Sequence, residues 1–338
     1  MASLKQGITV AGTLIADLFY EIDSYPKQGY LTTVRAQSHN IGGTGNLILD
    51  LAKLDGSLTV KVCALVGRDE SGDALREILA GYPNVDTDAV TVCGESSRTL
   101  VMNAADTKQR TFFFVPAASD IFCEEYIDWD KADAKIFHLE YLLLMKRVDT
   151  PDAEYGTHGA RILHDAKERG MMTSIDVVSE QGDRGARVIG AALRYTDICC
   201  INEAEAEAAT GVVLTEDGQP VPERIPQAID RLRELGVSKW IVIHTPKCGY
   251  GYDCERGEYV TVASLDLPRG YIKGSTGAGD AYCSGVLYGA YRDFSLADSM
   301  RLARACAACS LSENNGTDGM RAYDEVMALE QRFGEIKL

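Results

Sequence analysis

The pattern of hydrophobic and polar residues divides the chain into two parts. From Lys135 onward, short apolar runs such as 136–139, 172–177 and 240–244 alternate with segments whose apolar residues recur at helical spacing. Strands separated by helices of this length predict a parallel sheet covered by helices on both faces. We therefore expect an α/β fold for the larger part of the chain.

The N-terminal third has a different pattern. Residues 7–20 predict an apolar strand that Gly12 interrupts, and residues 87–115 are rich in β-branched and aromatic side chains without helical periodicity. Within this second segment, residues 99–103 and 110–115 predict the two strands of a hairpin. The first third therefore contributes strands that need not belong to the main sheet.

A glycine-rich turn stands out near the C-terminal end of the chain. Residues 274–280 (GSTGAGD) run directly into a segment of small and apolar residues with helical spacing. The first turn of a helix has unpaired N–H groups, and Gly277 and Gly279 let an anion approach the backbone closely. Asp280 suits the positive end of the helix dipole, but it also stands where a general base would act on a hydroxyl that attacks a bound phosphate.

Further polar residues follow the predicted strands of the parallel sheet. In such sheets ligands bind beyond the carboxyl ends of the strands, so residues from several strands meet at one edge. Their shared placement favours a site over a set of unrelated helix caps. These residues are Glu140, Asp176, Asn202 with Glu205, and His244 with Thr245.

Phosphoryl transfer is the reaction that these residue types suit. It needs charge neutralisation on the phosphoryl oxygens, an aligned hydroxyl and a group that takes the proton. The turn at 277–279 offers backbone N–H groups, Asp280 offers a base, and the helix start at 202–205 can hold Mg²⁺ through water molecules. The sequence contains neither G-x-x-x-x-G-K-[ST] nor G-x-G-x-x-G, so the P-loop and dinucleotide motifs are absent.

Composition narrows the possibilities. With 338 residues, of which 46% are hydrophobic, the chain can bury a large core, and a net charge of −16 argues against a nucleic-acid partner. No apolar run is long enough to span a membrane, and the N-terminal residues lack a signal-peptide core, so we expect a cytoplasmic protein without a membrane partner. The ten cysteines, including Cys306 and Cys309 in one helical segment and the neighbours Cys199 and Cys200, are expected to be buried free thiols.

The combined motifs resemble those of the ribokinase-like carbohydrate kinases, the phosphofructokinase B type. The turn Gly277-Ala278-Gly279-Asp280 is similar to the second signature of that family, and the segment 202–205 is similar to its Asn-x-x-Glu motif. Residues 66–72 are similar to its Val-Gly-x-Asp-x-x-Gly segment, and Asp17 lies where its early sugar-binding Asp falls. The resemblance covers nearly the whole chain.

The resemblance implies a fold and a set of roles. The fold would be a single α/β domain over residues 1–338, a three-layer sandwich with a mostly parallel central sheet and a small β lid formed by about 13–38 and 97–115. The activity would be ATP-dependent phosphorylation of a small sugar, with Mg²⁺, in a protein that forms a homodimer through the lid. Asp280 would be the base and Gly277, Ala278 and Gly279 the anion hole. The acceptor would contact Asp17, Gly42, Gly43, Asn46 and Glu140, and the nucleotide would contact Asn202, Glu205, Thr245, Gly249 and Thr276, with Glu205 holding Mg²⁺ through water.

The chain also departs from the family pattern in three places. Gly274-Ser275 replaces the usual Asp-Thr, which puts activation by a monovalent cation in question. Only Thr44 and Gly45 separate Gly43 from Asn46, where the family has three residues, so we expect an unusually shaped acceptor pocket. The nucleotide-side turn has Pro246 in place of the usual glycine.

Two alternatives to a sugar kinase stay open. Phe112, Phe113 and Phe114 suit base stacking in a nucleoside kinase, whereas the altered Gly274 and Pro246 suit a catalytically idle ligand-binding protein of the same fold. The sequence does not identify the acceptor. A phosphorylated or carboxylated acceptor would need a cation in the lid, and the candidates are Arg35, Arg98 and Arg110.

Overall fold

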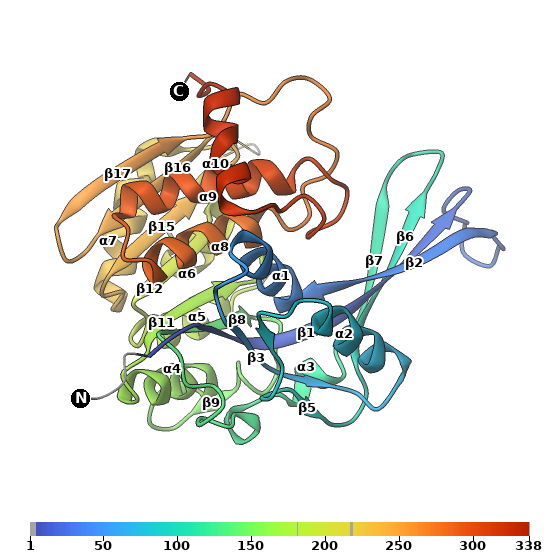
Figure 1. The fold of residues 1–338 in the computed structure, drawn as a ribbon, viewed down its shortest axis with the longest axis horizontal. Coiled ribbons are helices and arrows are strands. Elements are labelled where there is room, and N and C mark those ends of the chain that lie inside the picture. Colours follow the sequence, from blue (N-terminus) through green and yellow to red (C-terminus); the bar gives the residue numbers. More distant parts are fainter. Residues whose placement is uncertain (1–4, 181, 217–218, 338) are drawn as a thin grey trace.

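A mostly parallel sheet forms the centre of the molecule (Figure 1). The computed structural model describes residues 5–180, 182–216 and 219–337. The strands run in the order β17-β16-β15-β12-β11-β8-β1-β3-β4, with parallel pairing throughout except at β16 and β17, which pair antiparallel. Their bounds are β1 Ile8–Ile22, β3 Val60–Val66, β4 Val85–Asp86, β8 Ile136–Leu142, β11 Met172–Val177, β12 Ile198–Asn202, β15 Trp240–His244, β16 Cys248–Asp253 and β17 Glu258–Ala263, with β5 Thr91–Val92 beside β3.

Helices cover both faces of the sheet, as the alternating pattern predicted. One face packs against α1 (Thr44–Leu54), α2 (Glu70–Ala80), α8 (Ala278–Tyr291), α9 (Leu296–Ser310) and α10 (Tyr323–Arg332). The other face packs against α4 (His158–Glu168), α5 (Gly185–Leu193), α6 (Glu203–Thr210) and α7 (Ile225–Leu235). The remaining elements are α3 (Ala118–Ile121), η1 (Glu124–Tyr126), η2 (Pro222–Arg224) and the two-stranded pairs β9 (Pro151–Asp152) with β10 (Gly156–Thr157) and β13 (Thr215–Glu216) with β14 (Gln219–Pro220). None of the described helices combines the length and apolar character that crossing a membrane requires.

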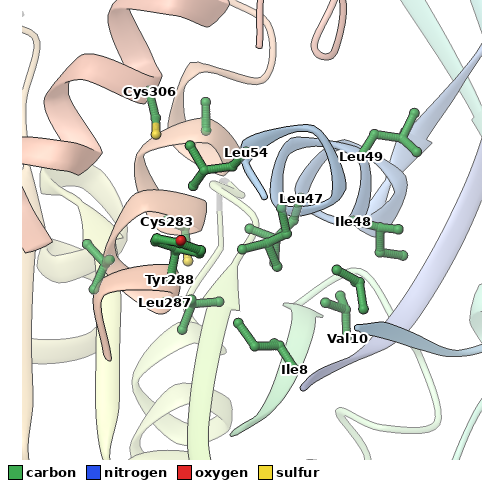
Figure 2. Packing of buried hydrophobic residues seen from close by; sticks show 14 of the residues in the cluster. Ile8, Val10, Leu47, Ile48, Leu49, Leu54, Cys283, Leu287, Tyr288 and Cys306 are labelled. Atoms are coloured by element: carbon green, nitrogen blue, oxygen red, sulfur yellow. The ribbon is translucent and has the colours of Figure 1, made fainter. Parts of the chain in front are cut away.

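A hydrophobic core joins α1 and α8 to the first half of β1. Leu47 and Leu54 of α1 pack with Leu287 of α8 and with Ile8 and Val10 of β1 (Figure 2). All these side chains are less than 2% exposed, so their burial fixes α1 against α8 through the hydrophobic effect. The cysteines are free thiols; eight of them, including Cys199, Cys200, Cys306 and Cys309, are buried as expected, whereas Cys93 and Cys254 are partly exposed.

A four-stranded lid extends from one end of the sheet. It consists of β2 (Val34–Gly43), the second half of β1, β6 (Ser97–Ala104) and β7 (Arg110–Val115), in the order β2-β1-β6-β7. Figure 1 shows these strands projecting away from the helices that cover the sheet. The predicted hairpin of β6 and β7 is confirmed. Strand β6 extends beyond the predicted 99–103 at both ends, and β7 has the predicted bounds.

Three predictions about the elements were wrong. Gly12 does not interrupt β1: a Cβ at this position would overlap the carbonyl oxygen of Glu140 on the neighbouring strand, so the glycine allows close packing of backbones. Strand β8 does not end at Glu140 but continues to Leu142. The pattern also missed α5, whose small and apolar residues are buried almost all round and therefore lack a polar face.

The segment at 66–72 has a structural part in the fold. The carboxylate of Asp69 accepts hydrogen bonds from the N–H of Gly72 at 2.8 Å and from the N–H of Ser96 at 2.8 Å. The first bond caps α2, and the second fixes the chain just before the lid strand β6. Asp69 therefore holds the base of the lid against the main sheet.

Candidate active site

The start of α8 follows a glycine turn that leaves backbone N–H groups available. Gly277 precedes the helix with φ 77°, and a Cβ there would also overlap the backbone of Gly316, so only glycine fits this position. The N–H groups of Gly279 and Asp280 belong to the first helical turn and have no acceptor within the helix. The turn predicted at 277–279 therefore presents backbone donors and the positive end of a 14-residue helix.

Asp280 is buried in this first turn and tied to two other elements. Only 7% of the surface of Asp280 is exposed. Asn46 of α1 donates from Nδ2 to Oδ2 of Asp280 at 2.9 Å, and the hydroxyl of Tyr141 on β8 donates to Oδ1. Burial raises the pKa of Asp280, while the hydrogen bonds from Tyr141 and Asn46 act in the opposite direction. The two donors therefore favour the ionised form that a general base requires.

Glu140 and Asp176 lie next to Asp280. One carboxylate oxygen from each of the three residues lies within 4.8 Å of the others. Alternation along the adjacent strands β8 and β11 turns both acids toward the face that α8 covers. Three oxygen donors so close could hold a divalent cation or share protons.

The three acids differ in how readily they ionise. Both carboxylate oxygens of Glu140 lack a hydrogen-bond partner among the described residues. Burial, together with the charge of Asp280, raises the pKa of Glu140 well above its usual value, and burial with the charge of Glu205 does the same for Asp176. Asp280 differs from Glu140 in that Asn46 and Tyr141 donate hydrogen bonds to it, and these bonds oppose the effect of burial on its pKa.

The predicted acceptor residues are brought together where β1, β2 and α1 meet. A Cβ at Gly42 would overlap the carboxylate of Asp17, so the acid lies directly over this glycine. Gly43, with φ 60°, packs against the carbonyl of Thr13 and ends β2 immediately before α1. Burial raises the pKa of Asp17 to about 6, although a hydrogen bond with the side chain of Thr99 acts to lower it. Asn46, two residues inside α1, bridges this corner to Asp280.

Asn202 and Glu205 form a complete capping box at the start of α6. Asn202 Oδ1 accepts from the N–H of Glu205 at 2.9 Å, and the Glu205 carboxylate accepts from the N–H of Asn202 at 2.9 Å. Ser179 donates to Glu205 at 2.8 Å, and burial raises the pKa of Glu205 to about 7. The pair is thus a helix cap first, and any contact with a metal ion must use the lone pairs that remain.

The three other predicted nucleotide contacts occupy different settings. Thr276 is exposed beside the anion-binding turn. Thr245 closes the turn between β15 and β16 by accepting from the N–H of Cys248 at 3.1 Å. Gly249 is buried on β16, where a Cβ would overlap the hydroxyl of Tyr282, so it supports α8 and does not line the cleft described below. His244 stacks on Tyr282 with ring centroids 5.0 Å apart, so it packs against α8.

A cleft of about 1100 Å³ opens between the lid and the C-terminal loops at 273–276 and 314–318. Arg110 of β7 crosses it and donates to the carbonyl of Asn314 at 3.2 Å and to the hydroxyl of Thr276 at 3.5 Å. Of the three arginines considered for an anionic acceptor, Arg35 pairs with Asp23 and Arg98 with Glu95, and Arg110 alone lines this cleft.

Several residues of the site were not predicted from the sequence. Tyr141 follows Glu140 on the same strand, where simple alternation would turn it to the opposite face, so no pattern indicated its contact with Asp280. Ser179 lies in a loop after β11, and Asn314 and Gly316 lie in a loop after α9. Loop residues of this kind carry no periodic signal.

The layered sheet, the β lid and the anion-binding helix start define a ribokinase-like kinase fold. A ribokinase from Arabidopsis thaliana, solved with ribose and ATP, superposes with a TM-score of 0.78 at 21% identity, covering 96% of this chain and 99% of that one. A Thermotoga maritima ribokinase gives 0.77 at 19% identity with 96% and 99% covered, and a Xylella fastidiosa fructokinase with bound ATP gives 0.74 at 21% identity with 97% and 99% covered.

A family model described as pfkB family carbohydrate kinase matches residues 5–322. The chain therefore belongs to the pfkB family of carbohydrate kinases. Comparison with curated proteins finds no significant match.

The Glu205→Gln variant should weaken the dependence of stability on pH. The pKa of Glu205 is about 7 in the folded protein and near 4.5 in the unfolded chain, so between these values the folded state binds the extra proton. The contribution of Glu205 to the free energy of unfolding is therefore largest below about pH 4.5 and is lost as the pH rises through 7. Glutamine can keep the cap but cannot ionise.

Urea unfolding between pH 4 and 8 measures this effect, with Glu168→Gln, an exposed position, as the matched control. We expect the free energy of unfolding to fall less steeply with pH in Glu205→Gln than in the wild type and the control. Parallel pH profiles for all three proteins would contradict the assignment.

Proposed function

We propose that the protein is an ATP-dependent phosphotransferase that moves the γ-phosphate of ATP to a hydroxyl group of a small sugar. The observation that carries this proposal is the buried carboxylate of Asp280, held by Asn46 and Tyr141 in the turn that also presents the anion-binding N–H groups. Membership of a carbohydrate kinase family supports it. So do the ribose and ATP bound to the A. thaliana ribokinase of similar fold.

In this reaction the acceptor hydroxyl oxygen bonds to the γ-phosphorus, the bond from that phosphorus to the β–γ bridging oxygen breaks, and ADP leaves. The hydroxyl proton passes to Asp280, which acts as the general base. The backbone at Gly277, Ala278 and Gly279 stabilises the charge on the transferred phosphoryl group. Asp17 and Asn46, with Gly42 and Gly43 beneath them and Glu140 behind Asp280, would orient the acceptor.

The nucleotide would lie along the start of α6 and the turn before α8. We assign its contacts to Asn202, Glu205, Thr245 and Thr276, whereas Gly249, buried against Tyr282, would act only by supporting α8. Magnesium fits this region because Glu205 and the nearby Asp176 offer carboxylate oxygens, and the engaged carboxylate of Glu205 suits an ion that keeps its water shell. When bound, Mg²⁺ would neutralise phosphate charge.

The Asp280→Asn variant tests the base directly. The amide oxygen can still accept the bond from Asn46, and the amide NH2 can donate to the hydroxyl oxygen of Tyr141, but the side chain cannot take a proton, so we expect kcat to fall by about 10²–10⁴-fold. ADP release measured with a coupled assay over a panel of sugars and nucleosides gives the rates, and unfolding curves show whether the fold is intact.

Asp88→Asn, an exposed substitution, serves as the control and should keep wild-type activity. If no acceptor in the panel makes the wild type release ADP faster than Asp280→Asn does, the chain is a catalytically idle ligand-binding member of the fold.

A nucleoside is the second candidate acceptor, and the register of the lid favours it. Pairing of Asp17 with Thr99, and of Thr99 with Phe114, places these residues on one face of the lid. Phe112 lies on the same face and lines the cleft, with 58% of the residue exposed, whereas Phe113 lies on the opposite face. An exposed aromatic ring in the cleft can stack on a planar base.

Alanine substitutions at these neighbouring positions separate the two acceptor classes. If the acceptor is a nucleoside, Phe112→Ala should raise its KM about tenfold, because stacking of a base on an aromatic ring contributes about 1–3 kcal/mol. Phe113→Ala is the matched control and should leave KM unchanged. Equal KM values for Phe112→Ala and the wild type would exclude stacking on this ring and leave the sugar as the acceptor.

We also propose that the protein forms a homodimer through the outer face of the lid. That face carries Leu18, Leu100 and Phe113 on adjacent strands, and β2 and β7 are edges of the lid. Apolar side chains and unpaired strand edges are stabilised by a second copy.

Sedimentation velocity should show a dimer for the wild type and a shift toward monomer for Leu100→Glu, which places a charge on that face. A wild-type monomer at all concentrations would exclude this mode of association.

A further inference from the structure

A second cluster of metal-binding side chains lies outside the candidate active site. Cys123 and Glu124 stand at the start of η1, and His158 is the first residue of α4. The thiol sulfur, one carboxylate oxygen and the imidazole Nδ1 all lie within 4.8 Å of one another. Three different donor types from two separate segments thus meet at one point.

The three side chains already point toward one another. The thiol of Cys123 donates to Oε2 of Glu124 at 2.6 Å, and Nδ1 of His158 lies 2.7 Å from Oε1 of the same carboxylate. Cys123 is buried, whereas about a quarter of each of the other two side chains is exposed. The cluster is therefore preorganised on its protein side and open to solvent on the other.

We propose that Cys123, Glu124 and His158 form a zinc site. Thiolate, imidazole and carboxylate are the ligands that Zn²⁺ takes in proteins, and the presence of sulfur and nitrogen distinguishes this set from a magnesium site. Three protein ligands and one water molecule from the exposed side complete a tetrahedral shell. This inference does not depend on the phosphotransferase activity.

Protons and charges balance in the proposed site. On binding, the thiol proton of Cys123 leaves to solvent, and the proton of His158 resides on Nε2, which leaves Nδ1 free to bind the metal. The thiolate and the carboxylate then match the two positive charges of the ion. Arg147, a cation close to Cys123, is paired with Glu125.

The site would brace the base of the lid. Residues 116–126 follow the last lid strand, β7, and within this segment Ser119 bonds to Ser97 of β6. His158 lies in α4, which packs on the far face of the main sheet. A bound ion would therefore connect the segment that leaves the lid to a helix of the main domain.

Titration of the purified full-length chain with Co²⁺, a spectroscopic substitute for Zn²⁺, tests the proposal. We expect one equivalent to bind with a near-ultraviolet thiolate-to-cobalt charge-transfer band and visible bands typical of tetrahedral coordination, all of which added Zn²⁺ removes. Zn²⁺ should also raise the Tm, because it binds the folded state.

Matched variants identify the thiol. Cys123→Ser should lose the charge-transfer band, and His158→Gln should lose the tetrahedral bands and the rise in Tm. Cys93→Ser, at a partly exposed cysteine outside the cluster, should keep all three signals. If Cys123→Ser does not fold, the partly exposed His158→Gln decides the test alone. Absence of a thiolate band in the wild type, its persistence in Cys123→Ser, or tetrahedral bands unchanged in His158→Gln would overturn the proposal.

Discussion

The whole arrangement depends on β1 being one continuous strand. Its first half pairs with β3 and β8 in the main sheet, and its second half pairs with β2 and β6 in the lid. Asp17, which we propose to contact the acceptor, therefore lies on the same strand that pairs with β8 beside Glu140. Backbone hydrogen bonds and strand pairing, more than any individual side chain, set the position of the lid relative to the helix start at Asp280.

Asp280 is held by a second constraint, which is steric and electrostatic. Its carboxylate accepts hydrogen bonds from α1 and β8, while Glu140 beside it has no hydrogen-bond partner within the part of the chain that the structure describes. Placing three acids together in a buried corner costs free energy, and the hydrogen bonds that Asn46 and Tyr141 donate to Asp280 offset part of this cost. Buried ionisable groups with perturbed pKa values are typical of functional sites.

Much of the fold was predictable because it follows from periodicity. Strands 172–177 and 240–244 were predicted to the residue. The expected meeting of Glu140, Asp176 and Asp280 followed from the rule that parallel strands end at one edge. Sequence periodicity gave wrong predictions at two kinds of position. Gly12 is required by the close approach of the β8 backbone, and helix α5 is buried on nearly all sides and so has no polar face.

The contacts of the site were less predictable than its location. The donor from Tyr141 and the approach of Gly316 to both Gly277 and Asn46 depend on residues far apart in sequence. The shortened spacing between Gly43 and Asn46 suggested an altered pocket, yet Asn46 still reaches Asp280. The helix begins at Thr44, directly after the last residue of β2, and this keeps Asn46 in its first turn.

This direct passage from β2 into α1 constrains how the chain can change its length. One residue more or fewer between 34 and 46 would turn the β2 side chains to the other face of the lid and rotate Asn46 by about 100° around α1, away from Asp280. Residues 24–33 join β1 and β2 without regular structure, and Tyr30 and Leu31 there are 76% and 94% exposed. We therefore expect insertions and deletions to be tolerated in the segment between β1 and β2 and not at the passage from β2 into α1. The length of the lid can then vary while the contact between Asn46 and Asp280 is kept.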